Sequence, residues 1–276
     1  MTTVPRISVV IPVYNGLAYV EETFRAVFQQ TATDWELILV DNRSTDGTSE
    51  LLRRLVEAQN DPRVRIVTNA VTLPAPENWN VGVREAKGEY LKLICADDIP
   101  TDDCLERQAR VLADHPTVSV AAGARIIINS RGRVMFTRSG IRRTGIYPGR
   151  DMIRRCIMSG TNIIGDPVNV MWRRSAMEKI GFFDPTVVYC TDVEYWLRLL
   201  SVGDLFYDTQ PVGYYRIHAK AAATGLSGVT VRDFLHTARL QEARGSVSLS
   251  PLDLRIIAMK SRFKSLLRQL IYRLLG

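Results

Sequence analysis

The chain has 276 residues, of which 46% are hydrophobic and 24% charged, and its net charge is +7. This length suits one large domain or one domain with an appendage, and the hydrophobic share is ample for a buried core. No stretch reaches the roughly 18 uninterrupted apolar residues of a membrane span, and no signal-peptide pattern opens the chain. Because the four cysteines show neither a Cys-x-x-Cys spacing nor a secreted framework, we expect reduced thiols in a soluble, cytoplasmic protein.

β-Branched strands alternate with amphipathic helices through the first hundred residues. Strands are predicted near residues 7–13, 36–40 and 64–67 and from residue 90, and helices near residues 19–30, 48–58 and 77–87. Such alternation is typical of βαβ units and a parallel sheet. We therefore expect an α/β fold with a Rossmann-like, mostly parallel central sheet flanked by helices.

The strand that starts at Tyr90 ends in two adjacent carboxylates, Asp97 and Asp98. An open α/β sheet binds its ligand beyond the carboxyl ends of its strands, and the first strand points at the same crevice. Neighbouring carboxylates repel, so the pair requires water, a cation, or Arg and Lys close by. Hard cations such as Mg²⁺ bind one or two carboxylates together with a substrate's phosphates. The alternative is a solvated turn.

An ordered set of motifs resembles family 2 glycosyltransferases with the GT-A fold over roughly residues 5–220. The motifs are Ile-Pro-Val-Tyr-Asn-Gly at 11–16, Leu-Val-Asp-Asn-Arg-Ser-Thr-Asp-Gly-Thr at 39–48, and the segments 80–82, 86–90, 97–98, 172–176, 181–184, 192–199 and 215–218. The resemblance implies a GT-A domain at residues 1–224, with a donor half at about 1–100 and an acceptor half at about 101–224. Residues 225–276 lie outside it.

The resemblance implies that Asp97 coordinates a divalent cation, Mn²⁺ or Mg²⁺, which bridges the two phosphates of a nucleotide-sugar, with Asp98 beside it as a further ligand. Arg216 pairs with phosphate oxygens, and His218 joins the metal or the diphosphate. The alternative for His218 is a surface or satisfied core residue. Many relatives carry a third acid where this chain has Cys95. The cation stabilises the charge that grows on the departing nucleoside diphosphate.

By the same resemblance, the nucleotide base and ribose lie where the first two strands end. The residues there are Pro12, Tyr14, Asn15, Asp41 and Asn42. Relatives commonly have an acid where Asn42 stands, and the amide oxygen can still accept a hydrogen bond, so a uridine or thymidine donor is preferred. Alternatively, Ser44, Thr45 or Asp46 caps the next helix. Trp79, where many relatives have Arg, stacks on the base or packs in the core, and packing is favoured.

An inverting transferase needs a base that takes the proton of the acceptor hydroxyl, and the resemblance assigns this role to Asp192. Relatives usually have Glu where Thr191 stands. Alternatively, Asp192 caps the helix that follows. Glu194 and Arg198 are spaced for a helix-surface salt bridge, and Glu194 is the next candidate base.

The C-terminal segment predicts a basic amphipathic helix. Its apolar face comprises Ile256, Met259, Phe263, Leu267, Leu270 and Leu274. Such a helix can lie on an anionic membrane, cover the domain's own core, or pair two subunits in a homodimer. The membrane alternative suits a lipid-linked acceptor at the inner face of a bacterial cell membrane. The basic stretches come with no nucleic-acid motif, so no nucleic-acid partner is expected.

Two other classes of function were weighed. A dinucleotide-dependent oxidoreductase is excluded because the first turn, Tyr14-Asn15-Gly16-Leu17-Ala18, lacks the Gly-x-Gly-x-x-Gly pattern. A catalytically silent nucleotide-sugar binding module would explain the departures at Asn42, Cys95 and Thr191. Because Asp97 and Asp192 are both kept, we favour an enzyme that moves a sugar from a UDP- or dTDP-sugar to a glycan or lipid-linked acceptor in polysaccharide synthesis.

Overall fold

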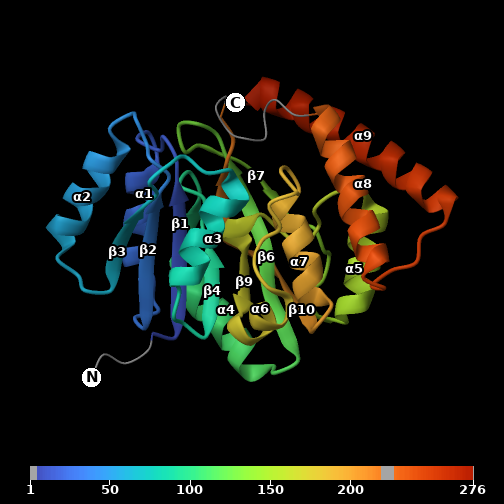
Figure 1. Ribbon diagram of the computed structural model, residues 1–276, viewed down its shortest axis with the longest axis horizontal. Coiled ribbons are helices and arrows are strands. Elements are labelled where there is room, and N and C mark those ends of the chain that lie inside the picture. Colours follow the sequence, from blue (N-terminus) through green and yellow to red (C-terminus); the bar gives the residue numbers. More distant parts are fainter. Residues whose placement is uncertain (1–4, 219–226, 276) are drawn as a thin grey trace.

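The computed structural model describes residues 5–218 and 227–275, and its strands form one mixed sheet (Figure 1). The strands are β1 (Ile7–Val13), β2 (Trp35–Asp41), β3 (Val64–Thr68), β4 (Tyr90–Leu93), β5 (Ile99–Pro100), β6 (Val118–Ile128), β7 (Val134–Arg138), β8 (Gly145–Tyr147), β9 (Val170–Arg173) and β10 (Asp204–Arg216). The sheet order is β3-β2-β1-β4-β9-β6-β10-β5, with β7 paired to β6 and β8 to β10.

Helices cover both faces of this sheet. They are α1 (Val20–Phe28), α2 (Thr48–Gln59), α3 (Ala75–Glu85), α4 (Cys104–Asp114), α5 (Gly149–Ser159), α6 (Arg174–Ile180), α7 (Thr191–Leu200), α8 (Ser227–Ala243) and α9 (Pro251–Leu275), with a short 3₁₀ turn η1 (Pro167–Asn169). The α1, α2 and α4 helices pack on one face, and α3, α5, α6, α7 and α8 pack on the other. The α9 helix lies outside this layer, against α5 and α8.

Because its side chains alternate between the two faces of the sheet, β1 contributes to the hydrophobic core on each face. Val9, Ile11 and Val13 face the core that holds Phe24 of α1, whereas Val10 faces the core under α3. Both faces are apolar, as expected of a strand buried in a parallel sheet. The expected α/β class with βαβ units is therefore confirmed.

The two halves of the sheet differ in strand direction. Parallel pairs join β3, β2, β1 and β4, which is the half that the sequence predicts in detail. β9 then runs antiparallel between β4 and β6, and β10 returns parallel to β6. The parallel half places the ends of β1, β2 and β4 at one edge, which lies at the top in Figure 1.

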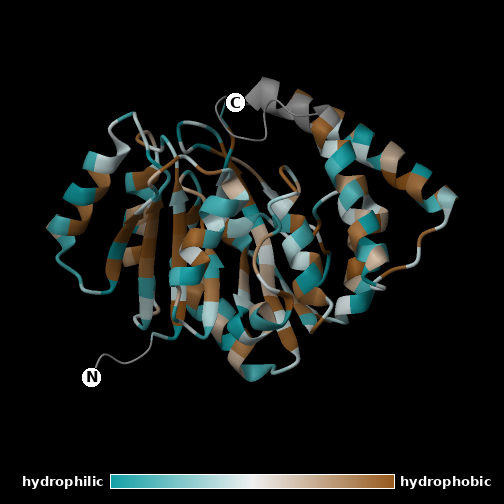
Figure 2. Cartoon of the chain, in the orientation of Figure 1, coloured by the Kyte–Doolittle hydropathy of each residue, from teal (hydrophilic) through white to brown (hydrophobic). Residues whose placement is uncertain are grey.

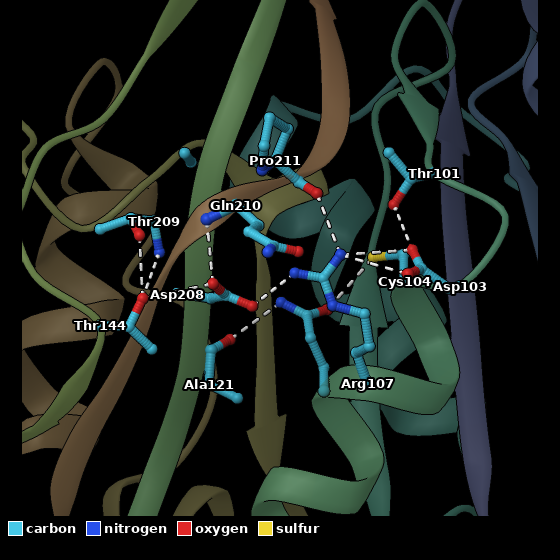
Figure 3. A network of polar contacts seen from close by, with 12 residues as sticks. Thr101, Asp103, Cys104, Arg107, Ala121, Thr144, Asp208, Thr209, Gln210 and Pro211 are labelled. Carbon is cyan, nitrogen blue, oxygen red and sulfur yellow. Dashed lines mark hydrogen bonds and ion pairs between the residues drawn. The ribbon is translucent and has the colours of Figure 1, made fainter.

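A bulge in β10 is held by Arg107 of α4. The pairing of β10 with β6 shifts register between Asp208 and Pro211. Arg107 forms an ion pair with Asp208, donates to the Pro211 carbonyl at 3.2 Å and also contacts Asp103 (Figure 3). Since a bulge changes the direction in which a strand presents its residues, this network sets how the end of β10 enters the functional site.

No helix in the ranges 5–218 and 227–275 combines the length and the apolarity that a bilayer span requires.

Candidate active site

The ends of β1, β2 and β4 bring three polar loops together at one edge of the sheet. Val13 of β1 is in register with Asp41 of β2, and β4 lies on the other side of β1 and leads into residues 95–98. The short β5 strand pairs antiparallel with β10, which carries Arg216 beside this edge. The expected crevice residues are thus neighbours, although they come from three distant parts of the chain.

Two loops at this edge are tied to each other and adopt uncommon backbone conformations. Asn15 accepts the Thr45 N–H at 2.8 Å through Oδ1, and its own N–H donates to Ser44 Oγ at 3.0 Å. Asn15 has φ of 50° and Arg43 has φ of 59°, in the left-handed region that non-glycine residues seldom occupy. Backbone strain of this kind concentrates at functional sites, where neighbouring contacts hold it in place.

Asp41 and Asn42 are buried and engaged with the protein itself. Asp41 accepts the Ser44 N–H at 3.1 Å and the Ser49 hydroxyl at 2.5 Å. Asn42 Oδ1 accepts from Asn69 Nδ2 and from the Leu73 N–H, each at 2.8 Å. Both side chains therefore fix the loops at this edge of the sheet.

The structure also shows where the other residues expected near the nucleotide lie, and whether the structural alternatives for Asp46 and Trp79 hold. Pro12 is buried in β1 and Tyr14 is exposed at the crevice. Gly47 is the N-cap of α2, and the Asp46 carboxylate accepts the Thr48 N–H at 3.1 Å, so Asp46 serves the helix start. Trp79 packs edge-on against Phe183, which confirms the packing interpretation.

Asp97, Asp98, Arg216 and His218 form one cluster. His218 Nε2 lies 2.8 Å from Asp97 Oδ2, and the Arg216 N–H donates to Asp98 Oδ1 at 3.0 Å. The Arg216 guanidinium donates to the Asp97 carbonyl at 2.9 Å and also pairs with Glu22. His218 therefore belongs to the site and is not an isolated surface residue.

The donor set in this cluster suits a hard divalent cation. Ligand atoms of Cys95, Asp97 and Asp98 lie within 4.8 Å of one another. Burial and the charge of Asp97 raise the pKa of Asp98 well above its usual range, so a cation here would relieve a real repulsion. Burial likewise raises the pKa of the Cys95 thiol. Carboxylate oxygens, with His218 beside them, therefore fit Mn²⁺ or Mg²⁺ better than a thiolate-bound metal.

Asp192 lies in the first turn of α7, and Cys190, not Asp192, is the N-cap. Its carboxylate accepts from the Val193 N–H at 2.8 Å and from Asn162 Nδ2 at 2.9 Å. Burial, and then the charge of Asp166, raise the pKa of Asp192 to about 7. A carboxyl group with such a pKa can take up a proton near neutral pH, as general base catalysis requires.

Arg125 and Asp166 complete the site, and the sequence analysis missed both. Arg125 Nε lies 2.7 Å from Asp166 Oδ2, and the pair lies next to the acidic cluster, since the Asp166 charge also raises the pKa of Asp98. Arg125 comes from the middle of β6 and Asp166 from the loop before η1. The one local signal is the dipeptide Asp166-Pro167 after a glycine, which is too common to identify a site.

Glu194 has a different role from the one expected of it. The ion pair with Arg198 is present at 2.8 Å, but Glu194 is fully buried, so the prediction of a surface salt bridge was wrong. Arg244, just after α8, donates to the same carboxylate at 2.6 Å. Arg198 also donates to the carbonyls of Ile180 and Phe182. Glu194 therefore joins α7 to the C-terminal segment and is bound by cations on two sides.

Comparisons with known proteins agree with this arrangement. Residues 8–181 match the family described as glycosyl transferase family 2. EpsE of Bacillus subtilis (strain 168), a glycosyltransferase by assignment, is 25% identical over 219 residues, which cover 78% of this chain and 73% of EpsE. The chain belongs to glycosyl transferase family 2.

Solved structures support the GT-A fold. Staphylococcus aureus TarS 1-349 in complex with UDP-GlcNAc has a TM-score of 0.68 at 17% identity, covering 97% of this chain and 72% of that one. The mannosyltransferase PcManGT from Pyrobaculum calidifontis in complex with GDP-Man and Mn²⁺ has a TM-score of 0.61 at 18% identity, covering 99% and 74%. At these identities the likeness concerns the fold alone.

Proposed function

We propose that this transferase is an inverting enzyme that moves a sugar from a UDP- or dTDP-sugar to a hydroxyl group of a glycan or lipid-linked acceptor. The observation that carries the proposal is the meeting of Asp97, His218 and Arg216 at the carboxyl edge of the sheet, with the half-buried carboxyl group of Asp192 close enough for its charge to act on Cys95. Membership of the family supports nucleotide-sugar chemistry, and a relative of the same fold binds UDP-GlcNAc.

In this proposal each residue has a separate task. Asp97, Asp98 and His218 would hold the divalent cation, which supplies positive charge next to the leaving diphosphate. Arg216 adds a fixed positive charge on the same side. The donor loops around Tyr14, Asn15, Asp41 and Asn42 hold the nucleotide.

Asp192 takes the proton of the acceptor hydroxyl as that oxygen attacks the anomeric carbon from the side opposite the diphosphate. Its raised pKa suits this task, because a base matched to neutral pH both accepts and releases a proton readily. The charges of Arg125 and Asp166 act on both Asp192 and Asp98. We assign them to the contact with the transferred sugar.

The biological setting belongs to the same proposal. We expect the acceptor in bacterial cell-surface polysaccharide synthesis, at the inner face of the cell membrane. The C-terminal helix would then contact the membrane, and pairing of two subunits in a homodimer is the competing role for this helix. The binding of GDP-Man and Mn²⁺ by PcManGT supports a divalent cation, whereas TarS favours the uridine donor.

The experiment is calorimetric titration of UDP into the protein with and without Mn²⁺. The wild type should bind UDP more tightly with the metal, and Asp97→Asn should lose this metal-dependent gain while its fold survives. Asp114→Asn, an exposed acid at the end of α4, is the matched control and should behave as the wild type. Unchanged metal-dependent affinity in Asp97→Asn would refute the metal assignment.

A panel of nucleotide-sugars then separates the enzyme from a silent binding module. Slow hydrolysis of one donor in the presence of Mn²⁺ identifies the sugar and supports the enzyme. Tight binding of a donor with neither hydrolysis nor transfer would support the binding module instead.

A further inference from the structure

The first turns of α9 pack on the core through Ile257 and Leu254, but beyond them the helix buries two serines and exposes apolar side chains. Ser261 and Ser265 are 1% and 4% exposed, whereas Met259 and Phe263 are 71% and 68% exposed. A surface helix of a globular protein normally shows the opposite arrangement, with its apolar side against the core. Packing on the chain's own core therefore accounts for Ile257 and Leu254 but not for the exposed apolar side chains of α9.

Several contacts fix this orientation. Ile257 is fully buried, and Gly160 allows the close approach of α9, because a Cβ atom at Gly160 would lie 2.8 Å from Ser261 N. The ammonium groups of Lys260 and Lys264 donate to the last two carbonyls of α5, at 3.0 and 2.8 Å. A cation at a helix C-terminus is favourable, so these contacts hold α9 with one particular side outward.

The outward side is a continuous apolar stripe, which we call the α9 stripe. It consists of Leu252, Met259, Phe263, Leu266, Leu267 and Leu270, all exposed. Their spacings of three, four and seven residues place them on one side of the helix. Figure 2 shows hydrophobic residues recurring along α9 at the periphery of the molecule. Exposed apolar surface gathered in this way usually marks a binding surface.

Positive charge flanks the α9 stripe. Exposed Arg255 and Arg262 lie along one side of it and Lys260 along the other, since 100° per residue places them at its margins. The helix carries six Lys and Arg residues and a single acid, Asp253. That acid accepts from the N–H and hydroxyl of Ser250, at 2.9 and 2.8 Å, and its own N–H donates to Ser250 Oγ at 3.1 Å, so Asp253 is engaged at the helix start.

Further exposed apolar side chains lie on β7. They are Val134 and Phe136, in a stretch of the chain rich in arginine. Burial lowers the pKa of Lys264 on α9, and the charge of Arg138 at the end of β7 lowers it further. In Figure 1 the C-terminal end of α9 lies at the top of the molecule, the direction in which the parallel strands end.

We propose that the α9 stripe and its flanking cations dock the protein on an anionic lipid bilayer, with α9 lying in the plane of the headgroups. An apolar strip bordered by Lys and Arg is the arrangement that interfacial helices use, because the strip enters the acyl boundary while the cations meet the phosphates. A second copy of the chain fits less well. Two α9 stripes packed together would bring like charges on their margins into contact, which opposes association.

This proposal rests on the proposed function in one respect, since the bilayer would supply the lipid-linked acceptor. The measurement is co-sedimentation of the full chain, without donor, with vesicles of phosphatidylglycerol and phosphatidylcholine at low salt. The wild type should bind, and added salt should weaken its binding. Phe263→Ser with Leu267→Ser should reduce the bound fraction by at least tenfold.

A charge variant and its matched control test the electrostatic part. Arg255→Gln with Arg262→Gln should weaken binding about 30-fold, because each cation near an anionic surface contributes roughly a fivefold gain in affinity. Arg53→Gln with Arg54→Gln removes the same charge from exposed positions on α2, at the opposite end of the molecule, and should leave binding unchanged.

Failure of this proposal is distinguishable from failure of the proposed function. Donor hydrolysis and UDP binding are measured without vesicles and should be normal in all three double variants. If the wild type ignores anionic vesicles at low salt, the proposal is wrong. A dimer in sedimentation that Phe263→Ser with Leu267→Ser dissociates, without vesicle binding, would show that a second copy covers the stripe.

Discussion

Asp192 is a half-buried carboxyl group whose environment opposes its charge. The carboxyl should therefore bind its proton until the pH approaches 7, the pKa that burial and Asp166 give it. A base works only when it is deprotonated, so transfer should rise with pH through about 7 and level off above it. The measurement is kcat against pH between 5 and 9 with a fixed donor and acceptor.

Replacement of Asp192 separates catalysis from binding. Asp192→Asn should lower kcat by about 10²–10⁴-fold, the usual contribution of a positioned base. Affinity for the nucleotide-sugar should persist, since the substitution leaves the cluster of Asp97, Asp98, Arg216 and His218 intact. Because the pKa of Asp192 is raised on folding, its charge costs stability, and this cost grows as the pH rises from about 4 to 7. Asn carries no charge, so the variant should gain thermal stability relative to the wild type at pH 8 but not at pH 4.

Glu194 provides the opposite case, a buried charge that its neighbours satisfy. Glu194→Gln leaves Arg198 without its carboxylate partner and should destabilise the fold by about 3–5 kcal/mol, as loss of one member of a buried pair does. Urea denaturation measures this change. Glu50→Gln, in an exposed pair with Arg53 on α2, should change stability by less than about 1 kcal/mol. Equal effects at the two positions would contradict the buried assignment.

The sequence predicts individual residues well where they end a strand. Asp97 and Asp41 were placed at one edge because parallel strands bring their carboxyl ends together. The burial of Glu194 was not predictable, since the i,i+4 spacing to Arg198 is the same whether that face of the helix is exposed or buried. What decides its burial is Arg244, which comes 50 residues later. Arg125 and Asp166 were missed for a similar reason, because they meet only after β6 and η1 have folded together.

At the scale of elements, α3 is held against the sheet by the absence of a side chain. A Cβ atom at Gly82 would lie 2.3 Å from Val10 Cγ1 and 2.8 Å from Val40 Cγ2. Gly82→Ala should therefore force α3 away from β1 and β2 and cost about 1–3 kcal/mol, despite the better helix propensity of alanine. Urea denaturation again gives the value, with Glu77→Ala on the exposed first turn of α3 as the control.

The same variant should affect donor binding. Asn78 of α3 accepts a hydrogen bond from Asn69, which in turn donates to Asn42. A displaced α3 should loosen this chain of amides and raise the donor KM more than it changes kcat. A loss of stability with an unchanged KM would show that the donor loops are independent of α3.

The sequence predicts the helices and strands of the first hundred residues better than it predicts the packing of the C-terminal helix. The strands and helices of the first hundred residues follow from their periodicity, because each βαβ unit is local. Of the apolar face predicted for the C-terminal helix, Met259, Phe263, Leu267 and Leu270 are exposed, whereas Ile256 is half-buried. Leu274 lies outside the described side chains. Which side of this helix packs inward depends on Gly160 and on the carbonyls of α5, and no pattern within the helix contains that information.

At the scale of the whole molecule, binding of a nucleotide at the proposed site should raise the free energy of unfolding. A ligand that binds only the folded state stabilises it by about 2.7 kcal/mol at a hundred times its Kd. UDP with Mn²⁺ should therefore raise the Tm by roughly 5–10 °C, given about 2–4 °C for each kcal/mol in a chain of this size. Differential scanning calorimetry with UDP alone, Mn²⁺ alone and both tests this. Equal shifts with and without Mn²⁺ would mean that the nucleotide binds without the cation.

Because Arg244 contacts Glu194 from a position late in the chain, part of the protein cannot finish folding until late in its synthesis. A ribosome adds residues at roughly 5–20 per second, so Arg244, which is the 46th residue after Arg198, appears about 2–9 seconds later. During that interval Glu194 has one arginine beside it and no α8 to cover it. The half of the protein that carries Asp192 therefore stays unfinished until the C-terminal segment emerges, and so does the core on the α3 side of the sheet, which includes Phe234 and Ala238 of α8.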